Sequence, residues 1–183
     1  MATVSSYPSW KWYSESDLLP EWVAPFLKVF SDSQPQIDSE HVRGLKSDDV
    51  LSAVQPGLSA LGYEVEMSKK KEDKVFRTVL WDEKGQPAVT YEVDAAHKGH
   101  GVVVEIEASR ANLGNAFYRD LVRTSLIAGA RFLVIGVANT YQYKTKGKLS
   151  ISRDYKFGRA ELDALFSSGR LRLPFEGVLL LGY

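Results

Sequence analysis

Three acids in neighbouring segments of the chain, Asp94, Glu105 and Glu107, have the type and spacing to act together. Successive side chains of a β-strand alternate between its faces, so Glu105 and Glu107 point one way while Val104 and Ile106 point the other way. Crowded carboxylates repel one another, and protonation or a bound cation relieves the repulsion. Because ligand sets made only of oxygen suit hard divalent cations, the pattern predicts a site for Mg²⁺, Mn²⁺ or Ca²⁺.

A turn-rich stretch, residues 97–101, separates the segment that ends at Asp94 from the segment that carries Glu105. If the two segments pair antiparallel across this turn, a symmetric register places Asp94 roughly opposite Val103 and diagonal to Glu105. All three acids could then meet at one spot.

Other interpretations of these acids stay open. The two glutamates could form the solvated face of an edge strand, with Asp94 merely ending its own strand. A slipped register would bring Glu92, which shares a face with Asp94, to Glu105 instead. His97 and His100 in the turn could act as bases or could simply be solvated.

The segments after Glu107 favour a strand inside a sheet. A helical stretch over about residues 113–129 leads to residues 131–137, which are apolar on both faces, as is typical of a buried central strand. Strand, helix and strand joined by short links form a right-handed crossover unit. Acids on an interior strand are costly unless they serve a site.

The other elements predict a single α/β domain, residues 1–183, in which helices flank both faces of a central mixed sheet. Residues 1–16 are expected to be an aromatic arm without clear period. Further helices are expected at residues 17–30, 40–61 with an interruption near Gly44, and 159–166, and further strands at residues 63–67, 75–81, 88–94 and 177–182.

This order of acids and elements resembles the core of the PD-(D/E)xK nuclease superfamily, through Asp94, ten residues, Glu105-Ile-Glu107, a polar link, a helix and an apolar strand. It looks like the branch that contains the BamHI and BglII restriction endonucleases, in which Glu or Gln replaces the usual lysine. The resemblance covers residues 89–137, within an expected nuclease core of residues 40–137. It implies a restriction endonuclease-like fold in which Asp94 and Glu105 hold the metal and Glu107 occupies the lysine position.

The resemblance also implies a function. We expect a Mg²⁺- or Mn²⁺-dependent DNA endonuclease related to type II restriction enzymes, and a homodimer, because cutting two strands needs two sites. Glu40, near a helix start, would be an additional metal-site acid, unless it is a solvated first-turn residue. The alternative function is a catalytically inactive nuclease-like domain that binds DNA or a protein partner. No phosphate-binding glycine loop or nucleophile elbow indicates an organic cofactor or another chemistry.

Charge is uneven along a chain whose net charge is zero. Residues 108–172 contain twelve Lys and Arg against four Asp and Glu, which suits contact with phosphate. The basic loop 141–148 also carries two aromatic residues that could stack on bases, although it could instead be a flexible surface hairpin. The expected DNA contacts are Arg110, Arg119, Arg123, Lys144, Lys146 and Lys148.

Composition agrees with a folded domain outside the secretory route. The chain is 44% hydrophobic and 25% charged, which is ordinary for a protein with a sizeable core. It has no Cys, no stretch approaching the roughly 20 apolar residues of a membrane helix, and no signal-peptide pattern at its N-terminus. We therefore expect a cytoplasmic protein that does not contact a membrane.

Overall fold

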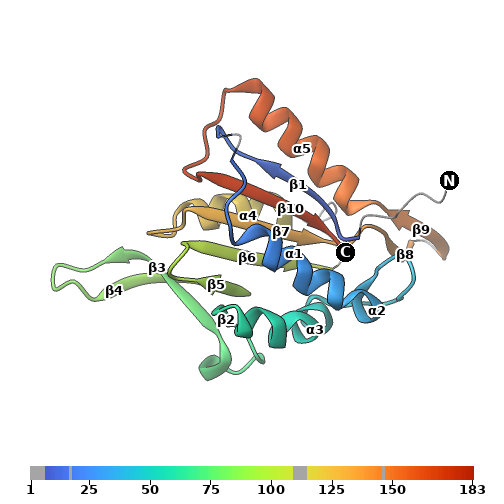
Figure 1. Cartoon of the computed structure of the whole chain (residues 1–183), viewed down its shortest axis with the longest axis horizontal. Coiled ribbons are helices and arrows are strands. Elements are labelled where there is room, and N and C mark those ends of the chain that lie inside the picture. Colours follow the sequence, from blue (N-terminus) through green and yellow to red (C-terminus); the bar gives the residue numbers. More distant parts are fainter. Residues whose placement is uncertain (1–6, 17, 109–114, 146) are drawn as a thin grey trace.

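A mixed six-stranded sheet with helices on both faces forms the centre of the molecule (Figure 1). The computed structural model describes residues 7–16, 18–108, 115–145 and 147–183. The sheet has the order β1-β10-β7-β6-β5-β2, and β3–β4 and β8–β9 form two separate ribbons. The predicted α/β class with a central mixed sheet is confirmed. The strands are β1 (Ser9–Tyr13), β2 (Glu64–Val65), β3 (Val75–Trp81), β4 (Pro87–Val93), β5 (Ala95–His97), β6 (Val102–Glu107), β7 (Phe132–Val137), β8 (Tyr141–Thr145), β9 (Lys148–Ser152) and β10 (Gly177–Gly182).

The helices divide between the two faces of this sheet. Those of one face pack with Val104 and Ile106, and those of the other face pack with Leu133 and Ile135. In Figure 1, α1 and α3 lie in front of the sheet and α4 lies behind it. Among the described residues, no helix combines the length and the apolar character needed to cross a bilayer. The helices are α1 (Val23–Asp32), α2 (Gln34–Ile37), α3 (Ser47–Ala60), α4 (Ala116–Ser125) and α5 (Asp154–Ser168), with a 3-10 turn at Lys71–Asp73.

The crossover unit predicted around the acids is present. Strand β6 lies parallel to β7, with Val104 beside Val134, and α4 connects the two strands. Strand β10 continues the parallel arrangement on the far side of β7, and every residue of β7 and β10 is buried. Strand β6 is therefore interior to the sheet, between β5 and β7.

The alternation of side chains along β6 decides where its acids point. Val104 and Ile106 belong to the core that α1 and α3 cover. Glu105 and Glu107 consequently face the opposite side, where α4 packs through Phe117 and Leu121. This is the shared orientation that the sequence predicts for the two glutamates.

Three expectations from the sequence differ from the structure. The predicted N-terminal arm contains a strand, β1, which pairs antiparallel with β10 because Trp12 packs against Trp22 and Phe132. The helix expected from residue 40 begins only at Ser47, since residues 39–46 form turns that include Gly44 at φ +73°. The strands expected at 75–81 and 88–94 do not join the central sheet, because β3 and β4 pair only with each other in a ribbon that extends away from it (Figure 1).

Candidate functional site

Asp94 lies where the antiparallel pairing of β5 with β6 stops. The register pairs Ala95 with Val104 and His97 with Val102, so the next position brings Asp94 toward Glu105. The predicted placement opposite Val103 was wrong by a two-residue shift. The cause is the turn, which spans residues 98–101 and closes through a hydrogen bond from Gly101 N–H to the Lys98 carbonyl.

The side chain of Asp94 accepts a hydrogen bond from β6 beyond the point where backbone pairing between β5 and β6 ends. Its Oδ2 accepts a hydrogen bond of 2.6 Å from the N–H of Ile106. Its main-chain carbonyl accepts another, of 2.8 Å, from the N–H of Glu66 in the segment after β2. The carboxylate is thereby held at a defined place beside β6.

One pocket of about 420 Å³ collects the three predicted acids between β6, α4 and the start of α3. The tips of β4 and β5 and the loop after β2 complete its walls. More carboxylates than cations line it. The carboxylates are those of Asp48, Glu92, Asp94, Glu105, Glu107 and Asp120, and the cations are those of Lys46, Lys69, Arg119 and Arg123.

Burial and mutual repulsion raise the pKa values of these acids. Burial, with the charges of Glu66 and Asp120, raises the pKa of Asp94 to about 6. Burial, followed by the charges of Asp94 and Asp120, raises the pKa of Glu105 well above its ordinary value. Burial and Asp120 raise the pKa of Glu107 to about 7, against the opposing charge of Arg119. The negative charge of these carboxylates is therefore not fully compensated, and a bound cation would stabilise their charged forms.

Asp120 is the functional candidate that reading the sequence missed. It belongs to the buried stripe of α4, between Phe117 and Thr124, and is 3% exposed. Among the described residues its Oδ2 has no hydrogen-bond partner. The signal was present in the sequence, because an acid at helical spacing between buried positions is unusual unless it is paired or used.

Arg119 supplies the positive charge nearest to Glu107. Its guanidinium lies 2.8 Å from Glu107 Oε1 and 2.9 Å from Asp120 Oδ1. Arg123, one turn later on α4, stacks over the Tyr91 ring at 4.8 Å, and its charge partly offsets the rise in the pKa of Glu105. Both arginines therefore face the acids of the pocket.

The N-terminus of α3 closes the pocket from the opposite side. Ser47 Oγ accepts a hydrogen bond of 3.3 Å from the N–H of Ala108, directly after Glu107. Asp48 pairs with Lys69 at 2.7 Å. The Tyr183 hydroxyl donates to the carbonyl of Glu107 at 3.1 Å, so the end of β6 is fixed from both sides.

Several other predicted residues do not reach this pocket. Glu40 is exposed in the turns before α3, and its main-chain N–H donates to Asp38. His97 and His100 stack on each other at the opposite end of β6, with ring centroids 4.4 Å apart. Glu92 does line the pocket, but it belongs to the β3–β4 ribbon and pairs with Lys74.

The predicted DNA contacts divide into three groups. Arg119 and Arg123 line the acidic pocket. Lys144 and Lys148 are exposed on the β8–β9 ribbon, so this stretch is the surface hairpin of the alternative interpretation. The other two, Arg110 and Lys146, lie outside the described residues.

The acids are not arranged as a finished coordination shell. Over residues 7–16, 18–108, 115–145 and 147–183, no group of three or more His, Asp or Glu side chains could hold a metal ion as it stands. Neither protein-family models nor curated proteins match the chain.

Proposed function

We propose that this protein is a Mg²⁺- or Mn²⁺-dependent endonuclease that hydrolyses phosphodiester bonds of DNA, in the manner of a type II restriction endonuclease. The observation that carries the proposal is the convergence of Asp94, Glu105 and Glu107 on one pocket beside an interior strand. Burying several carboxylates together destabilises a fold, so such a cluster indicates a site that a cation completes. Cutting both strands of a duplex would use two such sites, one from each subunit of a homodimer.

The residues present fit a hard divalent cation. Asp94 and Glu105 would hold it, and Asp120 Oδ2 offers a buried acceptor that has no partner among the described residues. Two carboxylates are sufficient for Mg²⁺, because it keeps several waters and takes further oxygens from substrate phosphates. When bound, the cation would lower the pKa of a water molecule and neutralise charge on the phosphate oxygens.

The remaining side chains have roles that follow from their places. Glu107 shares a face with Glu105 and would orient the attacking water and accept its proton, or assist a second cation. The water oxygen forms a bond to phosphorus, the bond to the leaving oxygen breaks, and that oxygen takes a proton from solvent. Arg119 and Arg123 face the same pocket and would offset the negative charge of the phosphate.

Cleavage of supercoiled plasmid tests the proposal. We expect nicked and linear products with Mg²⁺ or Mn²⁺ and none with a chelator. Glu105→Gln is expected to abolish cleavage while keeping the circular dichroism spectrum and melting temperature of a folded protein. Arg159→Gln on the exposed side of α5 is the matched control and keeps activity. Equal cleavage by the Glu105 variant would overturn the assignment of the site.

One observation favours the second candidate, a catalytically inactive domain that binds DNA or a protein partner. Arg119 already pairs with Glu107 and Asp120, so part of the demand for positive charge is met without a metal ion. Titration calorimetry with Mn²⁺, with Asp94→Asn as the control, separates the two candidates. Heat of binding that the variant lacks supports the nuclease, and no heat from either protein supports the inactive domain.

A further inference from the structure

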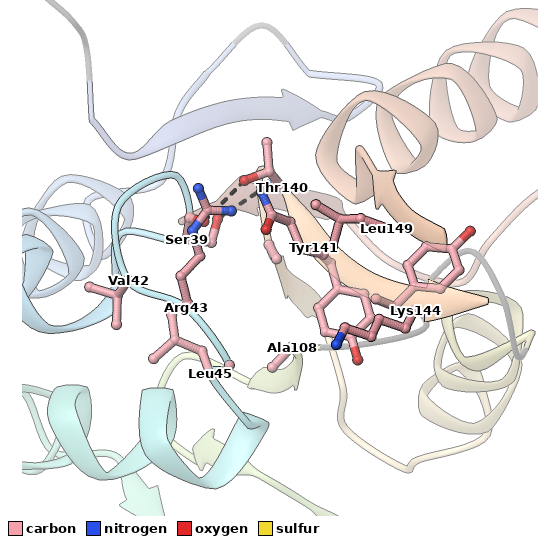
Figure 2. A pocket seen from close by; sticks show the side chains of 13 residues that line it. Ser39, Val42, Arg43, Leu45, Ala108, Thr140, Tyr141, Lys144 and Leu149 are labelled. Atoms are coloured by element: carbon pink, nitrogen blue, oxygen red, sulfur yellow. Dashed lines mark hydrogen bonds between the residues drawn. The ribbon is translucent and has the colours of Figure 1, made fainter. Parts of the chain in front are cut away.

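A second hollow of about 480 Å³ adjoins the acidic pocket. Residues 39–45 form one wall, and the start of β8 forms the other (Figure 2). In Figure 2, Arg43 projects from the first wall, and Tyr141 and Lys144 belong to the second, with Ala108 between the two walls. Hydrogen bonds between Ser39 and Thr140 join the walls at one end.

The chemistry of this hollow is opposite to that of the acidic pocket. Among the described residues that line it there is no carboxylate, whereas Arg43 and Lys144 bring two cations. Tyr141 adds an aromatic face. Cations with an aromatic surface are the combination that holds nucleic acid, through phosphate and base respectively.

Tyr143 extends the aromatic surface along the strand. It shares a face of β8 with Tyr141 because the two are two residues apart, and their rings lie 6.0 Å apart at an interplanar angle of 12°. Tyr143 also lines a third hollow, of about 430 Å³, together with Arg153, Lys156 and Phe157. The described lining of that hollow is again free of carboxylates. The two hollows and Tyr143 between them form a basic, aromatic track.

The track begins at the acidic pocket itself. Leu45 lines the first hollow and Lys46, the next residue, lines the acidic pocket. In the same way, Ala108 lines the first hollow and its neighbour Glu107 lines the acidic pocket. The hydrogen bond from Ala108 to Ser47 joins these two segments, so the first hollow and the acidic pocket lie on either side of this contact.

We propose that this track binds an unpaired stretch of the nucleic-acid strand next to the phosphodiester at the acids, an inference that rests on the proposed function and names the form of its substrate. The tyrosine rings can stack on bases only where the bases have left a duplex. The phosphates of that stretch lie against Arg43, Lys144, Arg153 and Lys156. The substrate is then a junction, overhang or opened duplex, cut beside its unpaired nucleotides.

Fluorescence anisotropy without divalent cations tests the track independently of cleavage. The probes are a labelled oligothymidylate and a blunt duplex of the same length. We expect the single strand to bind more tightly than the duplex, Tyr143→Ala to weaken its binding about tenfold, and Tyr143→Phe to bind as the native protein does. Tyr143 is chosen because Tyr141 also packs against the core. Trp81→Ala, at an exposed aromatic residue of β3 outside the track, is the matched control.

A second variant keeps the test decisive if Tyr143→Ala does not fold. Lys144→Gln with Lys156→Gln changes two exposed cations and is expected to reduce the salt dependence of single-strand binding by about 1.4 logarithmic units per unit of log salt, since each phosphate contact contributes about 0.7. Unchanged affinity in Tyr143→Ala, unchanged salt dependence in the lysine variant, or preference for the blunt duplex would overturn the track.

The two proposals fail in different ways. If the native protein cleaves DNA but Tyr143→Ala binds single strands normally, the track is wrong and the nuclease stands. If single strands bind through Tyr143 but neither Mg²⁺ nor Mn²⁺ produces cleavage of any substrate, the nuclease is wrong and the track remains as a binding site.

Discussion

The carboxylate of Asp94 replaces a strand residue as the hydrogen-bond partner of Ile106. Pairing between β5 and β6 ends at Ala95 and Val104, and the next N–H of β6 that points this way belongs to Ile106. Asp94 Oδ2 accepts it at 2.6 Å. One oxygen of the carboxylate is thus occupied by the fold, which leaves the other for a ligand and fixes its distance from Glu105.

This double role predicts different results for two substitutions at Asp94. Asparagine can accept the hydrogen bond of Ile106, whereas alanine leaves that buried N–H without a partner. Asp94→Ala is therefore expected to be about 1–3 kcal/mol less stable than Asp94→Asn, although both lose the negative charge. Urea denaturation at one pH gives the comparison. Equal stability of the two variants would show that the hydrogen bond contributes nothing.

Much of the fold could be predicted because its strands carry strong local patterns. The apolar runs of β7 and β10 and the alternation of β6 depend only on neighbouring residues, and the structure confirms all three. The placement of Asp94 could not be predicted so well. It depends on which residues the turn at 98–101 uses, and a shift of two residues leaves every side chain on the same face.

Asp120 and Glu40 show the same limit for the site. From its neighbours in the sequence, Asp120 is predicted only as a polar residue of a helix. The packing of α4 on β6 turns it toward the acids. Glu40 reads as a first-turn residue, but the turn at Gly44 delays the helix to Ser47. Long-range contact decides both placements.

The raised pKa values of the acids predict an unusual dependence of stability on pH. Unfolded carboxyl groups titrate near pH 4, whereas Asp94 has a pKa of about 6 and Glu107 a pKa of about 7 in the folded protein. Between these values the folded state binds more protons than the unfolded state. The free energy of unfolding of the metal-free protein is therefore expected to fall as the pH rises from about 4 to about 7.

Urea denaturation at several pH values without metal checks this slope. Glu105→Gln removes one of the coupled carboxylates and is expected to flatten the decline. Adding Mg²⁺ or Mn²⁺ at the upper end of the range is expected to restore stability, because the cation binds only the folded, deprotonated site. Stability that rises steadily with pH across this range would contradict the shared burial of the acids.

Removing the charge of Asp120 is expected to stabilise the metal-free protein near neutral pH. Asp120→Asn keeps an acceptor for Arg119 but no longer repels Glu105 and Glu107, so the pKa of each glutamate falls. A fall of one unit in the pKa of a glutamate raises the free energy of unfolding by about 1.4 kcal/mol at most. Melting curves and the carboxyl titration of the glutamates by NMR give the two readouts.

Asp163 provides a control of opposite sign for that substitution. It pairs with Lys11 at 2.5 Å and accepts a hydrogen bond from Tyr13, which lower its pKa. Asp163→Asn is therefore expected to destabilise the protein slightly, since the ion pair is partly exposed. If both variants shift stability in the same direction, Asp120 is not a source of repulsion in the pocket.

Arg119 and a divalent cation are expected to compete for the same acids. The guanidinium lies 2.8 Å from Glu107 and 2.9 Å from Asp120, so it relieves part of the repulsion in the metal-free protein. In Arg119→Met the pKa of Glu107 rises further, and the metal-free protein loses stability, by no more than about 1 kcal/mol because the arginine is half-exposed. The pocket carboxylates of the variant then repel one another more strongly, so saturating Mg²⁺ stabilises the variant more than the native protein. It should raise the melting temperature of the variant by about 2–4 °C more than that of the native protein.

The matched control is Arg159→Met, which removes an exposed arginine of α5 that lies 3.8 Å from Asp163. Mg²⁺ is expected to stabilise this variant and the native protein equally, since Arg159 has no contact with the pocket acids. A smaller effect of Mg²⁺ on Arg119→Met than on the native protein would mean that the arginine helps to hold the cation site together. In that case Arg119 cooperates with the cation, and its pairing with Glu107 no longer favours the inactive domain.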